Sequence, residues 1–398
     1  MIDPSDLLAT PNPLASRYTR FRVAERLLFT GHSHQAWPDR AFDGQVRAFH
    51  DAAELADGKW ERAFAMADRV RRGFAGLLGD VPERIALGPS TFDLVLRFLS
   101  GLPLRERPRL VTTDGEFHTI RRLLDRIAEE GVKVVKIPAD DAPNLAPRLA
   151  TAVDGRTAAV LVSAVLFRDA RIVPGLRDVA SACERAGTRL LVDAYHALGA
   201  IPFDLADQGL AGAWVVGGGY KYLQLGEGNC FLRFPEGCDM RPVATGWFSE
   251  FDELAAAPAA GRTPYGRGPL RFAGSTYDPV SHYRAAEVFD FFEEAGLTPQ
   301  LLREVSLGQT GRLAERFDAL DLDPAVITRD RSAPRSMYGG FLALHSPFAG
   351  PLCRELGRRG VLADFRGDVL RLGPAPYLST AQLDAAIGLL GETVSDTR

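Results

Sequence analysis

The sequence predicts an α/β protein with a mainly parallel sheet, followed by a smaller α+β domain. Short apolar runs alternate with amphipathic stretches between about residues 85 and 195, which is the pattern of right-handed βαβ units. An amphipathic stretch over 280–295 then separates this region from a set of shorter strand and helix patterns. The chain has 398 residues, 46 % of them hydrophobic, which is enough for a large domain and a smaller one.

Hydrophobic periodicity and turn residues place the individual elements. Residues 1–30 are expected to form an extended arm, and 40–78 a long, mostly helical region. The predicted strands of the large sheet are 85–88, 109–113, 132–137, 158–163, 188–192, 213–216 and 228–234. The predicted helices between them are 92–99, a helix that follows His118 and ends at 130, 142–153 and 174–186. Gly, Pro and Arg make 234–284 irregular, and 280–295 is the connecting helix. The remainder is predicted to hold helices 299–320, 348–359 and 380–393 and strands 338–344, 361–365 and 369–372.

Charge and cysteine usage indicate an ordinary cytoplasmic protein. The net charge is −4, with no long block of one sign, so we expect neither nucleic acid nor an anionic membrane as a partner. The four cysteines are scattered without a CxxC pair, which favours reduced thiols. The N-terminus has two early acids, three prolines and no apolar run, so neither a signal peptide nor a membrane anchor is predicted.

The chemistry-bearing residues concentrate in Arg189–Phe234. Asp193 follows an apolar run and is expected at the carboxyl end of a buried strand, where ligands bind in open α/β sheets. His196 comes three residues later, and Lys221 has glycines on both sides. Only four of the 47 basic residues are lysines. An amine can form a Schiff base and a guanidinium cannot, so we interpret Lys221 as a chemical group rather than a surface lysine in a turn.

These residues carry a family resemblance. Asp193-x-x-His196, followed by Tyr220-Lys221-Tyr222-Leu223 and Gly226-x-Gly228, resembles kynureninase and its relatives among the class V pyridoxal-phosphate (PLP) enzymes. The resemblance implies fold type I: a mainly parallel seven-stranded sheet sandwiched by helices, with a smaller C-terminal α+β domain. It also implies that Lys221 forms a Schiff base with PLP and that Asp193 pairs with the pyridinium nitrogen. A carboxylate there keeps the ring protonated as an electron sink.

The resemblance divides the chain and assigns the cofactor phosphate. It implies an N-terminal arm with part of the small domain over 1–45, a large PLP-binding domain over 46–284 and a small domain over 285–398. Ser90 and Thr91 stand at a predicted helix start, where free N–H groups and hydroxyls bind phosphate. Simple helix capping without a ligand is the alternative. The family holds the cofactor phosphate at this position.

One predicted strand end carries the group that contacts the cofactor ring. The strand concerned is the one predicted over 109–113. In class V enzymes an aromatic residue or a histidine follows this strand and lies over the ring, and Phe117 or His118 is the candidate. Stacking would supply apolar and π contact. The alternative is an aromatic side chain packed under the helix. Kynureninases have Phe-Pro-Ser-Asp here, so the choice between the two residues stays open.

Two segments of the irregular region suggest a homodimer with shared active sites. Gly246-Trp247-Phe248 resembles the Gly-Trp-Trp of kynureninases. Gly274-Ser275-Thr276 stands where class V enzymes reach the cofactor phosphate of the partner subunit. We therefore expect Trp247, Ser275 and Thr276 to complete the neighbouring site. An ordinary core or interface aromatic is the alternative for Trp247.

The substrate is expected to be an α-amino acid, held by its carboxylate. Asp368–Tyr377 resembles the family segment Gly-Ile-Arg-Val-Ala-Pro-x-Pro-Leu-Tyr, whose arginine binds that carboxylate, and Arg371 takes its place. Bidentate pairing makes arginine suitable; Arg366 is a second candidate. His32 stands at the position of an Asn in the relatives' first active-site turn and is a candidate substrate contact. His32-x-His34 lacks a third ligand of matching spacing, so no metal is predicted.

The resemblance implies a kynureninase-like reaction: hydrolytic Cβ–Cγ cleavage that releases alanine. Tyr220 is the candidate phosphate contact or proton donor, and His196 is expected to support the cofactor. Leu166, Phe248 and Glu250 depart from the family where an aryl ketone would be recognised, so the substrate side chain stays open. C–S lysis, desulfuration and amino transfer are the alternatives, although no cysteine stands in an obvious mobile loop. A silent binding protein of this fold should have lost Lys221 or Asp193, and both are present.

Overall fold

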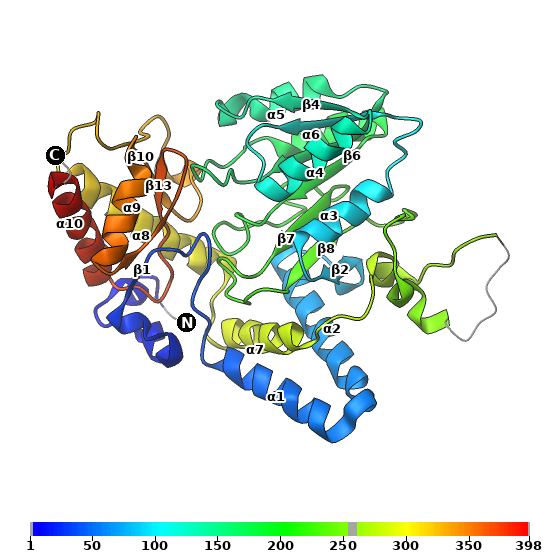
Figure 1. The fold of residues 1–398 in the computed structure, drawn as a ribbon, viewed down its shortest axis with the longest axis horizontal. Helices are drawn as coiled ribbons and strands as arrows, with labels where there is room; N and C mark the ends of the chain where they lie inside the picture. The colour runs from blue at the N-terminus through cyan, green and yellow to red at the C-terminus, as the bar shows by residue number, and fades with distance from the viewer. Residues whose placement is uncertain (1–2, 254–260, 397–398) are drawn as a thin grey trace.

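The computed structural model describes residues 3–253 and 261–396, and a seven-stranded sheet is its largest element (Figure 1). Its strands run in the order β2-β8-β7-β6-β5-β3-β4. Their bounds are β2 Ile85–Gly88, β3 Arg109–Thr113, β4 Lys133–Ile137, β5 Thr157–Ser163, β6 Arg189–Asp193, β7 Trp214–Gly218 and β8 Cys230–Arg233. Strand β8 pairs antiparallel with β2 and β7, and the other neighbours pair in parallel. The prediction of a mainly parallel seven-stranded sheet is confirmed.

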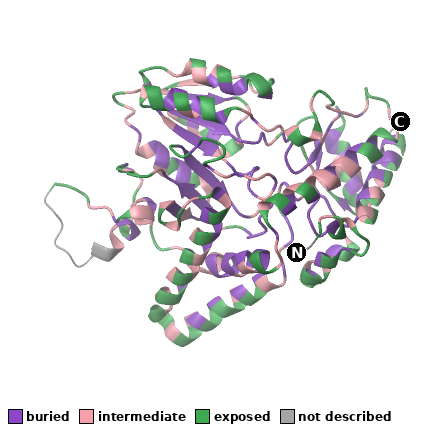
Figure 2. Cartoon of the chain, turned by 180° about the vertical axis from the view of Figure 1, so that it is seen from behind, coloured by how far each residue is buried: buried purple, intermediate pink, exposed green. Residues whose placement is uncertain are grey.

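Helices cover both faces of this sheet. They are α2 Lys59–Leu78, α3 Thr91–Ser100, α4 His118–Glu129, α5 Ala142–Ala152, α6 Leu176–Ala186 and α7 Val280–Glu294, and α1 Arg40–Leu55 packs against α7. Leu190 and Val192 of β6 belong to a core cluster with α2, α5, α6 and α7, whereas Leu191 belongs to a second cluster with α3 and α4. Successive strand residues point to opposite faces, and both faces are buried (Figure 2). This explains the continuous apolar runs.

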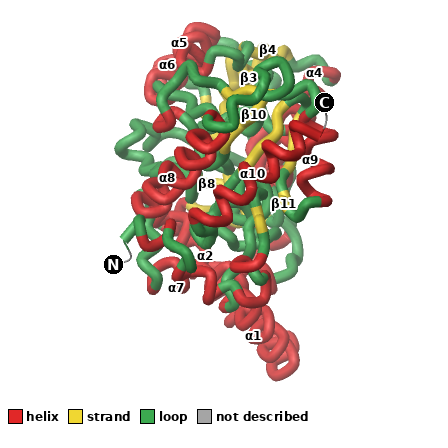
Figure 3. Tube along the Cα trace, turned by 90° about the vertical axis from the view of Figure 1, so that its left-hand side faces the viewer, coloured by secondary structure: helices red, strands yellow, loops and turns green. Residues whose placement is uncertain are grey.

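A second, four-stranded sheet forms with the C-terminal helices, beside the large sheet in Figure 1. Its order is β12-β13-β10-β9, with bounds β9 Thr328–Arg329, β10 Leu342–His345, β12 Asp364–Arg366 and β13 Val369–Leu372. The helices are α8 Pro299–Asp318, α9 Ala349–Arg358 and α10 Thr380–Asp396. Helix α1 projects away from the body (Figure 3). Among the described residues, no helix has the length and apolar character needed to cross a membrane.

The N-terminal segment is not the extended arm that the sequence predicts. It forms four short 3-10 helices, Asp6–Leu8, Pro13–Arg17, Thr19–Phe21 and Val23–Glu25. Leu7, Leu14 and Tyr18 are buried, and the Asn12 amide donates to the carbonyl of Pro376. Strand β1, Leu27–Leu28, then pairs in parallel with β11, Val361–Leu362. The segment is therefore tied to the C-terminal part of the chain.

Two predicted strands near the C-terminus also need correction. The run 361–365 is divided at Ala363, because β11 pairs with β1 whereas β12 pairs with β13. The run 338–344 begins as a strand only at Leu342. The remaining 3-10 helices are Ala56–Gly58, Pro82–Arg84, Trp247–Glu253, Gly268–Phe272 and Arg335–Met337.

Candidate active site

A pocket lies at the carboxyl ends of the parallel strands. Asp193 is the last residue of β6, and Lys221 follows the end of β7, which pairs with β6 in parallel. Parallel pairing brings the two side chains together although they are far apart in sequence. Six of the predicted site residues line the pocket: Thr91, Phe117, Asp193, His196, Tyr220 and Lys221.

The amine of Lys221 is enclosed by aromatic side chains. Lys221 is 5 % exposed, and its Nζ lies 2.8 Å from His196 Nε2. The same Nζ lies 4.5 Å from the ring centre of Tyr195 and 5.1 Å from that of Phe117. Burial lowers the pKa of Lys221 to about 7, although the charge of Asp193 opposes the change. A large share of the amine is therefore unprotonated, and so nucleophilic, at neutral pH.

Lys221 of the cofactor-free chain should react with acetic anhydride in proportion to its neutral fraction. With a pKa of about 7, that fraction rises from about one tenth at pH 6 to about nine tenths at pH 8 and then levels off. Mass spectrometry of the acetylated peptides measures the profile, with Lys59, Lys133 and Lys136 as internal references. A Lys221 profile that still rises tenfold per pH unit up to pH 10 would contradict a lowered pKa.

Asp193 and His196 supply a carboxylate and a neutral imidazole to the same pocket. Asp193 Oδ1 accepts a 2.8 Å hydrogen bond from the backbone N–H of Tyr195. Burial raises the pKa of Asp193, whereas this hydrogen bond and the charge of Lys221 lower it. Burial, followed by the charge of Lys221, holds the pKa of His196 well below its usual value. His196 Nδ1 is buried and has no hydrogen-bond partner among the described residues.

Sequence reasoning missed a second buried acid, Glu116, behind this pocket. Its Oε1 accepts a 2.6 Å hydrogen bond from the Thr113 hydroxyl, and its Oε2 accepts one of the same length from the Ser163 hydroxyl. Burial raises the pKa of Glu116 to about 7, and the nearby charge of Asp193 acts in the same direction. In the sequence, Glu116 is marked only by its position three residues after the end of β3 and immediately before Phe117.

The structure separates the two candidate phosphate contacts. The Ser90 side chain caps α3: it accepts from the backbone N–H of Asp93 at 3.2 Å and donates to the Asp93 carboxylate at 2.5 Å. Thr91 is the first residue of α3 and lines the Lys221 pocket. The Thr91 hydroxyl is therefore placed to bind an anion, whereas the backbone N–H groups of Asp93 and Leu94 already donate to Ser90.

The structure also separates the two candidate ring contacts. Phe117 lines the Lys221 pocket, whereas His118 begins α4 and is exposed. Burial and the neighbouring charge of Arg121 lower the pKa of His118. Of the two candidates, Phe117 is therefore the one that we expect to stack on a ring bound beside Lys221.

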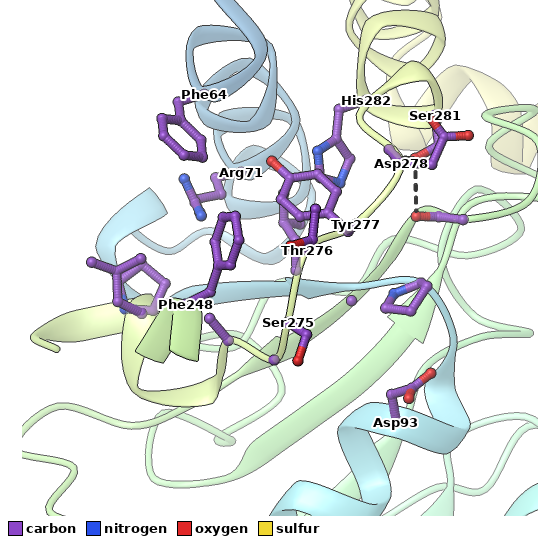
Figure 4. A pocket seen from close by; sticks show the side chains of 18 of the residues that line it. Phe64, Arg71, Asp93, Phe248, Ser275, Thr276, Tyr277, Asp278, Ser281 and His282 are labelled. Atoms are coloured by element: carbon purple, nitrogen blue, oxygen red, sulfur yellow. Dashed lines mark hydrogen bonds between the residues drawn. The ribbon is translucent and has the colours of Figure 1, made fainter. Parts of the chain in front are cut away.

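Ser275 and Thr276 do not reach this pocket in their own chain. They are exposed and line a different cavity of about 1200 Å³, together with Phe64, Arg71 and other residues (Figure 4). That cavity and the Lys221 pocket share no lining residue. Trp247 is 42 % exposed and packs on Phe248, with 4.3 Å between ring centres.

Arg371 is held in a fork by an acid that sequence reasoning did not identify. Arg371 Nε and Nη2 donate to the two oxygens of Asp364 at 2.8 and 2.5 Å, and Nη1 donates to the carbonyl of Phe167. His32 Nε2 lies 2.7 Å from Asp364 Oδ1. His34 instead stacks on Tyr220, with 4.8 Å between ring centres, so the two histidines face different partners.

The pocket fits PLP by the chemistry of its side chains. Lys221 offers a buried amine of lowered pKa for the aldehyde group, and Asp193 offers a carboxylate for the ring nitrogen. The unpartnered Nδ1 of His196 can bond another polar atom. Thr91 and the start of α3 suit the phosphate, and Phe117 suits the ring.

Comparisons with known proteins agree with this chemistry. A family model described as kynureninase C-terminal domain matches residues 302–390. Three similar curated proteins are the uncharacterized aminotransferase YcbU of Bacillus subtilis (23 % identical; 86 % of this chain and 88 % of the relative covered), isopenicillin N epimerase of Streptomyces clavuligerus (28 %; 87 % and 89 %) and kynureninase of Bacillus cereus (25 %; 87 % and 79 %).

Solved structures with this fold include PLP enzymes. The cystine C–S lyase C-DES aligns with a TM-score of 0.81 at 17 % sequence identity, over 93 % of this chain and 98 % of its own. A cysteine desulfurase from Thermococcus onnurineus aligns with a TM-score of 0.80 at 16 % identity, over 100 % and 99 %. The predicted fold type I is confirmed, and pyridoxal 5′-phosphate is the cofactor that the comparisons indicate.

Proposed function

We infer that this chain hydrolyses the Cβ–Cγ bond of an α-amino acid with a γ-carbonyl group, because it resembles the kynureninase-like, PLP-dependent enzymes of aminotransferase class V. One water is consumed, and alanine and a carboxylic acid are released. The observation that carries the proposal is the match of the kynureninase C-terminal domain to residues 302–390, the segment that contains Arg371. Kynureninase similarity over 87 % of the chain supports it.

The residues of the Lys221 pocket divide the work of such a reaction. PLP, when bound, supplies an electron sink for the bonds at Cα and Cβ. Lys221 holds the cofactor through its amine, and that amine, once the substrate amine has replaced it, takes the Cα proton at Nζ. Asp193 keeps the ring nitrogen protonated. Burial raises the pKa of Tyr220 to about 12, so its hydroxyl keeps a proton that it can donate to the substrate or to the phosphate.

Product analysis tests this reaction. The holoenzyme is incubated with L-kynurenine, 3-hydroxykynurenine and, separately, cysteine thioethers, and alanine, aromatic acids and pyruvate are measured. We expect alanine and an aromatic acid in equal amounts from at least one kynurenine, and neither product from the Lys221→Ala variant. Pyruvate and ammonia from a thioether, with no alanine from either kynurenine, would instead support a C–S lyase.

We also propose that two copies of the chain share their active sites. Ser275 and Thr276 are exposed and lie on a cavity separate from the Lys221 pocket, so their hydroxyls are available to another copy. Trp247 is exposed, and the next residue, Phe248, donates its N–H to the carbonyl of Gly274, the residue before Ser275. In this arrangement each chain contributes Thr276 to the phosphate site of its partner.

Mixing two inactive variants should restore activity if the sites are shared. In a hybrid of a Lys221→Ala chain and a Thr276→Asp chain, one of the two sites has both an intact Lys221 and an intact Thr276. Random mixing makes about half of the dimers hybrids, so the mixture should have about a quarter of wild-type activity. The exposed Thr263 provides the matched control, because Thr263→Asp should remain fully active. Hybrid dimers that form, as shown by native mass spectrometry, yet remain inactive would contradict shared sites.

A further inference from the structure

The fork between Asp364 and Arg371 is built into the small sheet. The two residues face each other in the antiparallel register of β12 and β13, so their side chains leave the same face of the sheet. Arg371 is 3 % exposed. Burial would raise the pKa of Asp364, but the His32 hydrogen bond and the Arg371 guanidinium hold it well below its usual value. The carboxylate therefore stays ionised, and the fork persists at neutral pH.

The contacts of Arg371 leave part of its guanidinium available. A guanidinium carries five N–H donors. Asp364 takes one from Nε and one from Nη2, and the carbonyl of Phe167 takes one from Nη1. Two N–H groups, one on each terminal nitrogen, have no acceptor in the described part of the chain. Two such donors are what a second carboxylate needs.

The neighbours of Arg371 connect it to the Lys221 pocket. Phe167, which accepts from Nη1, also lines that pocket. The ring of Phe341 lies 5.5 Å from Arg371 Cζ and 6.2 Å from the His196 ring centre. Arg371 is also among the charges that lower the pKa of Lys221. The Arg371 guanidinium is therefore close to the place where chemistry is expected.

A second layer holds Asp364 itself. His32 is fully buried at its side chain and contacts Asp364 Oδ1 through Nε2. Burial lowers the pKa of His32 to about 4, so this ring is neutral. A Cβ atom on Gly373 would lie 2.2 Å from His32 Nδ1, so glycine is required there to admit the imidazole. The N-terminal segment thus delivers His32 onto the small sheet at a site shaped for it.

We propose that Asp364 is a positioning residue, which fixes Arg371 so that its two remaining N–H groups bind the α-carboxylate of an amino-acid substrate, and that His32 in turn holds Asp364. This inference rests on the proposed function of Arg371. Its rival is that Asp364 is a counter-ion that the substrate carboxylate must displace. Removal of Asp364 weakens carboxylate binding in the first case and strengthens it in the second.

Matched ligand pairs separate these cases. The holoenzyme is titrated with amino acids and their decarboxylated amines, namely kynurenine with kynuramine, phenylalanine with phenethylamine, and alanine with ethylamine. The dissociation constants come from the change in cofactor absorption. The variants are Asp364→Ala and the isosteric Asp364→Asn. Asp384→Ala is the control, because Asp384 accepts the same two-bond fork from Arg312 at 2.8 and 2.7 Å on α8 and α10, which do not carry site residues.

For every ligand pair with measurable binding, wild type and Asp384→Ala should bind the amino acid more tightly than its decarboxylated amine. Asp364→Ala should weaken amino-acid binding by about 10- to 100-fold, the usual effect of misplacing a binding group, and leave amine binding within about twofold. Asp364→Asn keeps the size and shape of the side chain and serves as the test if Asp364→Ala does not fold. It should also weaken amino-acid binding, but by a smaller factor. In an Arg371→Ala background, Asp364→Ala should change nothing further.

Three results would overturn the proposal: tighter amino-acid binding in Asp364→Ala, an equal loss for amine and amino acid, or no carboxylate preference in wild type. Because these are binding measurements, they do not depend on whether alanine is formed. An enzyme that binds amino acids through Arg371 but yields no alanine would overturn the hydrolytic function and leave the role of Asp364 standing.

Discussion

Replacement of Lys221 by alanine is expected to reduce turnover by about 10⁴-fold or more, the size of effect seen when a covalent catalytic group is removed. The chain loses both the amine that holds the cofactor and the base beside His196 Nε2. Lys221→Arg should be equally inactive, because a guanidinium keeps the charge but cannot act as this nucleophile.

Turnover, cofactor content and melting temperature are measured together for these variants. Lys133→Ala is the matched control, because Lys133 is an exposed residue of β4 at the edge of the sheet and should tolerate the change. Turnover within tenfold of wild type in Lys221→Ala would show that another group carries out the chemistry.

Replacement of Asp193 by asparagine is expected to lower turnover by about 10²- to 10³-fold, the range for losing one electrostatic contact at a reacting group. The cofactor should remain bound through Lys221 and the start of α3. Without the carboxylate, the residue at position 193 would no longer favour the protonated form of a bound pyridine nitrogen, so the ring would accept electrons less well.

Absorbance and turnover of the loaded enzyme check this expectation. Asp178→Asn, at an exposed position in the first turn of α6, is the control and should be unchanged. If Asp193→Asn binds the cofactor and turns over at nearly the normal rate, the protonation of the ring is set by a different group. Glu116 would then be the next residue to replace.

The large sheet could be predicted because each strand has a direct signature in the sequence. Runs such as 158–162 are apolar without a break, since both faces of the sheet are covered by helices. The meeting of Asp193 and Lys221 also followed, because parallel neighbouring strands end at the same edge. In these places local pattern and tertiary structure agree.

The N-terminal segment and the small sheet were harder to predict, because pairing partners decide them. Residues 3–30 lack a helical or alternating period, and their short turns are held by contacts with the C-terminal region, such as Asn12 to Pro376. Strand β9 has only two residues. The division of 361–365 depends on two different partner strands. None of these features is encoded within a short window.

Asp364 and Glu116, the two acids next to the site, also could not be identified from the sequence alone. Asp364 faces Arg371 only because a tight turn sets the register of β12 and β13, and spacing along the chain does not distinguish it from other acids. Glu116 is notable only once Thr113 and Ser163 are seen to enclose it. The groups that can bear the chemistry were recognisable by residue type, whereas the groups that position them required the fold.

Borohydride reduction of the holoenzyme, followed by peptide mass spectrometry, tests the central claim most directly. Reduction makes the bond between the cofactor and its lysine permanent. The cofactor-derived mass should appear on the peptide that contains Lys221, at up to one per chain. The same mass on Lys59, Lys133 or Lys136, with Lys221 unmodified, would contradict this assignment of the active site.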